Sequence, residues 1–219
     1  MTRVKICCIA DPQEAGLAIK YGASAIGLVS EMPSGPGVIS EQAIIEIAET
    51  VPPGIATFLL TSKRDVSEII QQQRKCRTDT IQICDTLNKG SHKELKDSLP
   101  GIKIVQVIHV AGEESIEEAI NVSANVHAIL LDSGNRNLSI KELGGTGRTH
   151  NWKISREIVK SVGIPVYLAG GLNPENVADA IKRVEPFGVD ICSGVRTGGK
   201  LDEDKLKLFF DKFRSADNE

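Results

Sequence analysis

The 219-residue sequence lacks the features that mark membrane proteins and nucleic-acid-binding proteins. No run approaches the about 20 consecutive apolar residues of a membrane-spanning helix, so no membrane contact is expected. Lys and Arg number 26 against 29 Asp and Glu, and the net charge of -3 provides no basic surface for nucleic acid. Any anionic ligand must therefore be bound by a local site.

Cysteine is also scarce, with five residues, an odd number, and no Cys-x-x-Cys pair. The pattern suggests neither a disulfide framework nor a zinc knuckle, and no metal site is expected. The N-terminus lacks the apolar stretch and small-residue cleavage site of a signal peptide. Together these absences predict a reducing, cytoplasmic location.

What the sequence does contain is a regular alternation of short apolar runs and longer amphipathic stretches. Its length and its 41% apolar content predict one domain over residues 1–219, with a sizeable core. About eight runs are rich in β-branched residues. The predicted strands are 4–9, 25–30, 55–60, 80–84, 103–109, 128–132, 165–169 and 189–192.

Several of these runs are apolar at nearly every position, which is typical of parallel strands covered on both faces. The predicted helices are 12–21, 41–50, 66–75, 115–121, 154–162 and 174–184. Two of them begin with a capping side chain before a proline, Asp11 and Asn173. Because no G-x-G-x-x-G follows the first strand, this α/β pattern favours a (β/α)8 TIM barrel over an open dinucleotide-binding sheet.

Glycine-rich turns follow the last two predicted strands, with Gly170 and Gly171 after the seventh and Ser193 and Gly194 after the eighth. Glycines let backbone N–H groups approach a phosphate closely, and helix N-termini add partial positive charge. Since these two loops are neighbours in a barrel, they predict a phosphate site. The alternative is that the glycines only make tight turns.

Two residues at strand ends could carry chemistry. Cys7 lies at the end of the first strand, where a thiol of lowered pKa could act as a base or nucleophile. Asp132 ends the sixth strand and could act as a general acid across the barrel mouth. The structural alternatives are a small core residue for Cys7 and a loop cap for Asp132. Cys8 is expected to point the other way on the strand, into the core.

Two connections are longer than their strands and helices require, residues 31–40 and residues 133–151. They follow the second and sixth predicted strands. In a barrel both therefore lie at the C-terminal face, where chemistry is expected.

With these motifs in order, the sequence resembles the phosphoribosylanthranilate isomerase family, tryptophan-pathway barrels that perform an Amadori rearrangement. The resemblance runs over nearly the whole chain. It includes Val-Lys-Ile-Cys at 4–7, residues 21–27, Gln82, Leu-Leu-Asp-Ser at 130–133, Gly-Gly-Thr-Gly at 144–147 with Asn151 and Trp152, residues 168–177, and Val-Asp-Ile-Cys-Ser-Gly-Val at 189–195. Seven such segments in the right order are specific.

The resemblance implies a role for each matched residue. Cys7 would be the general base and Asp132 the general acid of a proton shuttle that uses neither metal nor organic cofactor. The only partner implied is a phosphorylated small molecule, and the chain would be a monomer or homodimer. The residues implied to hold the phosphate are Gly145, Gly147, Gly170, Gly171, Ser193 and Gly194, and those implied to make other substrate contacts are Lys5, Gln82 and Arg196.

The sequence also departs from the family pattern. Where the family has Ser-Pro-Arg after the second strand, residues 31–37 contain no cation for the anthranilate carboxylate. Asp85 follows the fourth strand and is expected to repel an anionic substrate. Cys8 replaces a glycine, and Ala10 a threonine. Arg196 follows the eighth strand as either a replacement cation or a surface residue.

These departures leave three functions open. The first is phosphoribosylanthranilate isomerase. The second is an isomerase or lyase for a phosphosugar without an aryl carboxylate. The third is a non-catalytic phosphometabolite sensor, which would need neither the thiol nor the acid.

Overall fold

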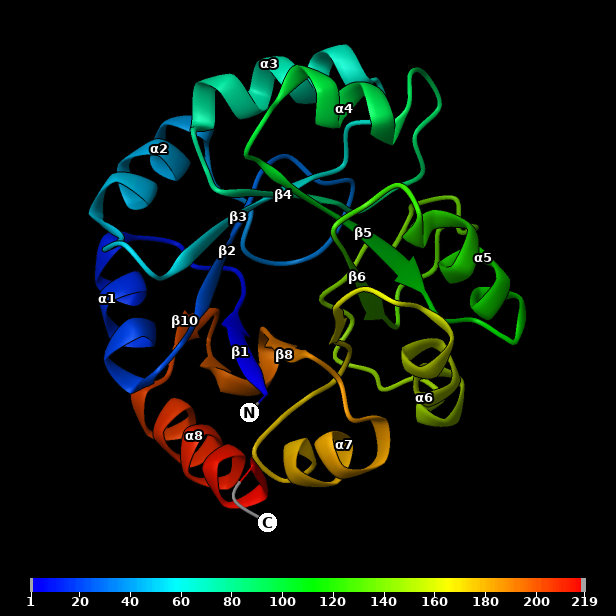
Figure 1. The fold of residues 1–219 in the computed structure, drawn as a ribbon. Helices are drawn as coiled ribbons and strands as arrows, with labels where there is room; N and C mark the ends of the chain where they lie inside the picture. The colour runs from blue at the N-terminus through cyan, green and yellow to red at the C-terminus, as the bar shows by residue number, and fades with distance from the viewer. Residues whose placement is uncertain (1, 218–219) are drawn as a thin grey trace.

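The computed structural model describes residues 2–217, and its eight parallel strands close into one barrel in chain order (Figure 1). The barrel closes where β1 pairs with β8. The (β/α)8 prediction is confirmed; residues 1 and 218–219 of the predicted domain lie outside the described residues. The strands are β1 (Arg3–Ile6), β2 (Ala25–Val29), β3 (Ala56–Thr61), β4 (Thr80–Ile83), β5 (Lys103–His109), β6 (Ala128–Asp132), β7 (Val166–Leu168) and β8 (Gly188–Ile191).

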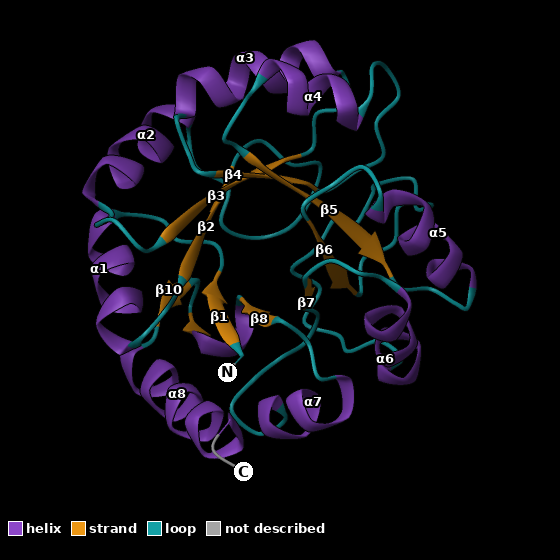
Figure 2. Cartoon of the chain, viewed as in Figure 1, coloured by secondary structure: helices purple, strands orange, loops and turns teal. Residues whose placement is uncertain are grey.

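Helices surround this ring of strands (Figure 2). The six predicted helices are present, and two more complete the ring. The short, charged α4 buries Leu95, and α8 buries Leu206, Phe209, Phe210 and Phe213, a helical spacing readable from the sequence. The helices are α1 (Pro12–Tyr21), α2 (Glu41–Thr50), α3 (Val66–Cys76), α4 (His92–Ser98), α5 (Glu114–Ser123), α6 (Trp152–Ser161), α7 (Val177–Val184) and α8 (Glu203–Asp217).

The two proline-linked caps have different outcomes. The Asp11 carboxylate accepts a 2.8 Å hydrogen bond from the backbone N–H of Glu14 and caps α1, as predicted. The predicted start of α7 at Asn173 is wrong. The Asn173 side chain instead accepts hydrogen bonds from the N–H groups of Glu175 and Asn176, which forms a turn, and α7 begins only at Val177.

Successive side chains on a strand point to opposite faces, so each strand contributes residues both to the core beneath the helices and to the interior of the barrel. On β1, Val4 and Ile6 pack in the main core beneath the helices, while Lys5 and the following Cys7 turn into the barrel. Asp190 on β8 is the register partner of Lys5. The inward positions therefore carry polar side chains just below the mouth.

The end of β1 differs from the prediction. The strand stops at Ile6, and Cys8 has a left-handed backbone with φ of 63°, so strand alternation does not apply to it. Cys8 is buried beside Cys7 at the barrel mouth. The expectation that Cys8 points away from Cys7 is therefore wrong.

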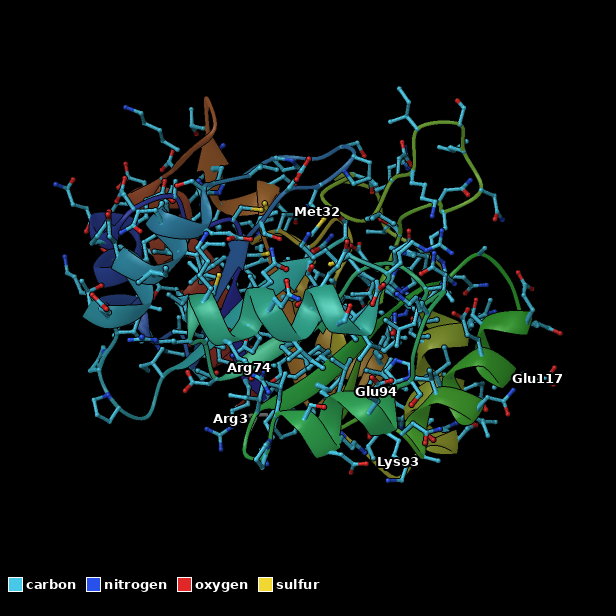
Figure 3. The ribbon with its side chains drawn as sticks, turned by 90° about the horizontal axis from the view of Figure 1, so that it is seen from above. Arg3, Met32, Arg74, Lys93, Glu94 and Glu117 are labelled. Carbon is cyan, nitrogen blue, oxygen red and sulfur yellow. The ribbon has the colours of Figure 1, made fainter. Side chains whose placement is uncertain are left out.

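The two long connections meet at the C-terminal face. The Ser34 hydroxyl, after β2, donates a 2.6 Å hydrogen bond to the carbonyl oxygen of Lys141, after β6. In the side view of Figure 3, Met32 lies at the upper edge of the barrel, and Arg3, at the start of β1, lies below it. The hydrogen bond between Ser34 and Lys141 joins the two connections over one side of the barrel mouth.

Candidate active site

A pocket opens at the C-terminal mouth of the barrel and gathers most of the predicted site residues. Eight of them contribute to its lining, whereas Lys5, Gly194 and Arg196 do not. The eight are Cys7, Gln82, Asp132, Gly145, Gly147, Gly170, Gly171 and Ser193. We call this hollow the mouth pocket.

Cys7 is buried at the pocket floor, and its surroundings favour the thiolate. A hydrogen bond from the neighbouring Cys8 thiol and the positive charge of Lys5 outweigh burial and lower the pKa of Cys7. The pKa of Cys8 is raised by its interactions with Cys192 and Cys7 and by burial. Of the two adjacent thiols, Cys7 is therefore the one suited to act as a base.

Lys5 lies beneath the mouth pocket instead of in its lining. It is fully buried, and its ammonium group lies 2.9 Å from Oδ2 of Asp190. Burial opposes the charged ammonium, but the Asp190 carboxylate raises the pKa of Lys5 above its ordinary value. Lys5 is thus placed to act on Cys7 from below, not to touch a ligand in the pocket.

Asp132 is the last residue of β6, and its carboxyl group lines the pocket. Its Oδ1 accepts a 2.7 Å hydrogen bond from the N–H of Ser133. Two histidines flank it, the buried His109 on the neighbouring strand and the half-buried His150 in the following loop. Burial lowers the pKa of His150 to about 4 and also lowers that of His109, so both rings are neutral near pH 7.

The glycine-rich turns form the wall beyond Asp132. Gly171 has φ of +63°, and a Cβ added there would come within 2.6 Å of the Arg148 carbonyl carbon. Gly194 lies outside the pocket lining because it packs against the preceding loop, where an added Cβ would come within 2.1 Å of the Leu172 carbonyl oxygen. Because these glycines lack side chains, the turn after β7 can approach both the loop after β6 and the turn after β8 closely.

Gln82 brings an unpaired acceptor to the pocket. It is buried on β4, and its amide nitrogen lies 3.9 Å from the Cys84 sulfur. Its Oε1 has no hydrogen-bond partner among the described residues. An unpaired buried oxygen that faces a pocket is suited to accept a hydrogen bond from a ligand hydroxyl or N–H group.

Arg196 corresponds to neither sequence interpretation. Its guanidinium group is buried, so the surface interpretation is wrong, and it points away from the pocket to form a two-pronged ion pair with Glu14 at 2.8 and 3.0 Å. It also donates to the carbonyl oxygen of Cys8. Arg196 therefore anchors the segment after β1 to α1.

Asp85 is likewise not a free negative charge, so the expected repulsion is not supported. Its carboxylate lies 2.5 Å from the Lys141 ammonium and 3.7 Å from the Arg64 guanidinium. Burial opposes its ionisation, but the Lys141 hydrogen bond, the Thr86 N–H and the nearby charges keep the pKa of Asp85 below its ordinary range. Asp85 does not line the mouth pocket.

Asp190 was not predicted as a site residue, although it lines the pocket and pairs with Lys5. Its position two residues before Cys192 on an alternating strand is the signal that could have revealed it. Within the described part of the chain, no cluster of three His, Cys, Asp or Glu side chains is arranged to hold a metal, and no helix is long and apolar enough to span a membrane.

The fold and the pocket define a (β/α)8 barrel in which a candidate base and a candidate acid face glycine-rich turns after the last strands. The model of the N-(5'-phosphoribosyl)anthranilate isomerase family matches residues 4–212. The chain therefore belongs to this family.

Individual relatives agree over almost the full length. N-(5'-phosphoribosyl)anthranilate isomerase of Methanocella arvoryzae is 37% identical over 195 residues, which cover 89% of each chain, and that of Haloarcula marismortui is 33% identical over 99% of this chain and 98% of its own. The solved enzyme of Thermotoga maritima matches with a TM-score of 0.81 and 29% identity, over 98% of this chain and 100% of that one.

A second solved phosphoribosyl anthranilate isomerase contains a ligand, reduced 1-(o-carboxyphenylamino)-1-deoxyribulose 5-phosphate. It matches with a TM-score of 0.79 and 28% identity, over 98% of this chain and 100% of that one. The similarity therefore extends to an enzyme with a bound phosphorylated compound.

Proposed function

We propose that this chain catalyses the Amadori rearrangement of N-(5'-phosphoribosyl)anthranilate to the 1-deoxyribulose 5-phosphate product in tryptophan biosynthesis, an aldose–ketose isomerisation. The observation that carries the proposal is that Cys7 and Asp132, from opposite sides of the barrel, line one pocket with the glycine-rich turns. Family membership supports the same substrate.

The chemistry divides into an acid step and a base step. Asp132 donates a proton to the ribose ring oxygen as the C1'–O bond breaks, and the anilino nitrogen supplies the electrons to form a protonated Schiff base. The Cys7 thiolate removes the C2' proton, and the electron pair gives an enolamine that becomes the ketone. C1' is reduced and C2' oxidised within one molecule, so the electrons balance without metal or cofactor.

The phosphate would occupy the glycine-rich wall of the mouth pocket. The backbone N–H groups of its turns are the proposed donors, since glycine allows the backbone to approach a phosphate closely. Gln82, with its unpaired oxygen, would accept a hydrogen bond from a ribose hydroxyl. The proposed phosphate-binding residues in the pocket lining are Gly145, Gly147, Gly170, Gly171 and Ser193, while Gly194, outside the lining, would let the turn that contains Ser193 pack closely against the turn after β7.

A fluorescence assay that follows loss of N-(5'-phosphoribosyl)anthranilate tests the proposal. We expect Cys7→Ala and Asp132→Asn each to lower kcat by about 100-fold or more, the range of general acid–base catalysis. Cys76→Ala is the matched control, because Cys76 is a buried thiol at the end of α3, outside the pocket. It should retain kcat.

Absence of turnover by the folded wild-type protein would contradict the proposal. In that case, thermal stabilisation by simple phosphosugars, but not by reduced 1-(o-carboxyphenylamino)-1-deoxyribulose 5-phosphate (the reduced product), would favour an isomerase or lyase of another substrate class. Stabilisation without any turnover of phosphosugars would favour a sensor.

A further inference from the structure

The mouth pocket has no side-chain cation for the substrate's aryl carboxylate. Its described lining residues include two carboxylates, Asp132 and Asp190, and neither lysine nor arginine. At the rim after β2, Met32 and Ser34 line the pocket instead of a cation. A carboxylate bound there needs a positive partner from a neighbouring element.

Lys141 is the cation that adjoins this rim. A shallow outer hollow shares Met32 and Leu143 with the mouth pocket, so the two spaces adjoin at these side chains, and Lys141 is the only cation among the described residues that line the outer one. The Ser34 hydroxyl holds the Lys141 carbonyl oxygen at 2.6 Å, which fixes the lysine backbone at the rim. Its side chain is 31% exposed.

The Lys141 ammonium group is held at this position by Asp85, at 2.5 Å. Asp85 is the less mobile partner, because its side chain is only 5% exposed. It has two further partners that do not depend on the lysine, the Thr86 N–H at 2.8 Å and the Arg64 guanidinium at 3.7 Å. Lys141 can therefore leave Asp85 without stranding a buried carboxylate.

We propose, on the basis of the function proposed above, that Lys141 binds the aryl carboxylate of the substrate and so determines specificity for anthranilate. In the free protein Asp85 keeps the ammonium group near the rim. When substrate binds, the flexible lysine stem moves the ammonium group to the carboxylate, and Arg64 neutralises Asp85. The cation absent after β2 is thus supplied by the loop after β6.

Steady-state kinetics with two substrates test this role. Lys141→Met should raise KM for N-(5'-phosphoribosyl)anthranilate by about tenfold, the effect of one charge-assisted hydrogen bond at a half-exposed site, with kcat changed less than about twofold. For the N-(5'-phosphoribosyl)aniline analogue, which lacks the carboxylate, the same variant should leave KM unchanged. Lys141→Arg keeps a cation and should restore most of the affinity.

Two controls separate binding from a structural role. Lys93→Met removes another ion-paired lysine, on α4 and away from Met32 in Figure 3, and should change neither KM. Asp85→Asn releases Lys141 and should leave KM for the anthranilate substrate unchanged or lower. A structural pair would instead raise KM equally in Asp85→Asn and Lys141→Met.

The proposal is overturned if Lys141→Met leaves KM for the anthranilate substrate unchanged, or raises it equally for both substrates. Calorimetric binding of the reduced product, with and without its carboxyl group, distinguishes this failure from failure of the proposed function. Weaker binding by Lys141→Met confined to the carboxylated ligand supports Lys141 even if the wild-type protein shows no turnover. A Lys141→Met protein that binds the carboxylated ligand as tightly as the wild-type protein does, or that binds both ligands equally more weakly than the wild type, refutes it.

Discussion

Replacing Lys5 with methionine tests how the barrel interior activates the proposed base. Lys5 is fully buried, 2.9 Å from Asp190, and its charge helps to lower the pKa of Cys7. Methionine keeps the unbranched shape and removes the charge. Both Asp190 and Cys7 therefore lose a positive neighbour, with separate consequences for stability and for catalysis.

The stability loss follows from the broken ion pair. Removing one member of a buried pair costs about 3–5 kcal/mol, because the other charge is left uncompensated. Burial already raises the pKa of Asp190, so in the variant this carboxyl can take up a proton instead of remaining charged. We therefore expect a loss near the lower end, about 3 kcal/mol of unfolding free energy.

The catalytic effect has a definite sign. Lys5 lowers the pKa of Cys7 by more than the Asp190 charge raises it, so removal of Lys5 raises the pKa of Cys7 even when Asp190 takes up a proton, and the acidic limb of kcat/KM moves to higher pH. Asp190→Asn is the matched control with the opposite sign, because the Asp190 charge raises the pKa of Cys7. In that variant the acidic limb should move to lower pH.

Urea unfolding and kcat/KM measured as a function of pH provide the two readouts. A double variant, Lys5→Met with Asp190→Asn, should recover most of the lost stability, since no unpaired charge remains. An acidic limb that stays in place in the folded Lys5→Met protein, or that moves in the same direction in both single variants, would refute the role given to Lys5.

Two further substitutions test the architecture around the pocket. Gly171→Ala puts a methyl group at positive φ and against the backbone of the loop after β6, so it should raise KM by about tenfold or more and lower Tm. The control Gly54→Ala, at positive φ in open space, should lower the unfolding free energy by only about 1 kcal/mol and leave KM unchanged. Arg196→Met should lower the unfolding free energy by about 3 kcal/mol, because Glu14 loses its partner, while KM stays constant. A large KM increase with unchanged stability would show that Arg196 contacts substrate.

The barrel could be predicted from the sequence because its signals are local. Apolar runs that alternate with amphipathic stretches fix the order of strands and helices, and that order places the strand-end residues Cys7 and Asp132 on one face. Family motifs then supplied their proposed roles. The strand containing Cys7 was nevertheless predicted too long, because the left-handed backbone of Cys8 leaves no signal in residue type.

The partners of charged residues could not be predicted from local patterns. Arg196 pairs with Glu14, which is 182 positions away, and Asp85 pairs with Lys141, which is 56 positions away. Only the closed barrel brings these loops together. A carboxylate that looks unpaired in the sequence, such as that of Asp85, can therefore be paired with cations in the folded protein.

The distribution of charge around the mouth pocket suits an acid and a base that must work together. The substrate brings a phosphate and a carboxylate, yet the described pocket lining offers no cationic side chain. A lysine inside the pocket would form an ion pair with Asp132, which opposes the proposed role of that carboxyl group as a proton donor. Backbone N–H groups can bind the phosphate without supplying such a counter-ion. The cations are then confined to positions where they do not meet Asp132, with Lys5 below Cys7 and Lys141 held by Asp85 at the rim.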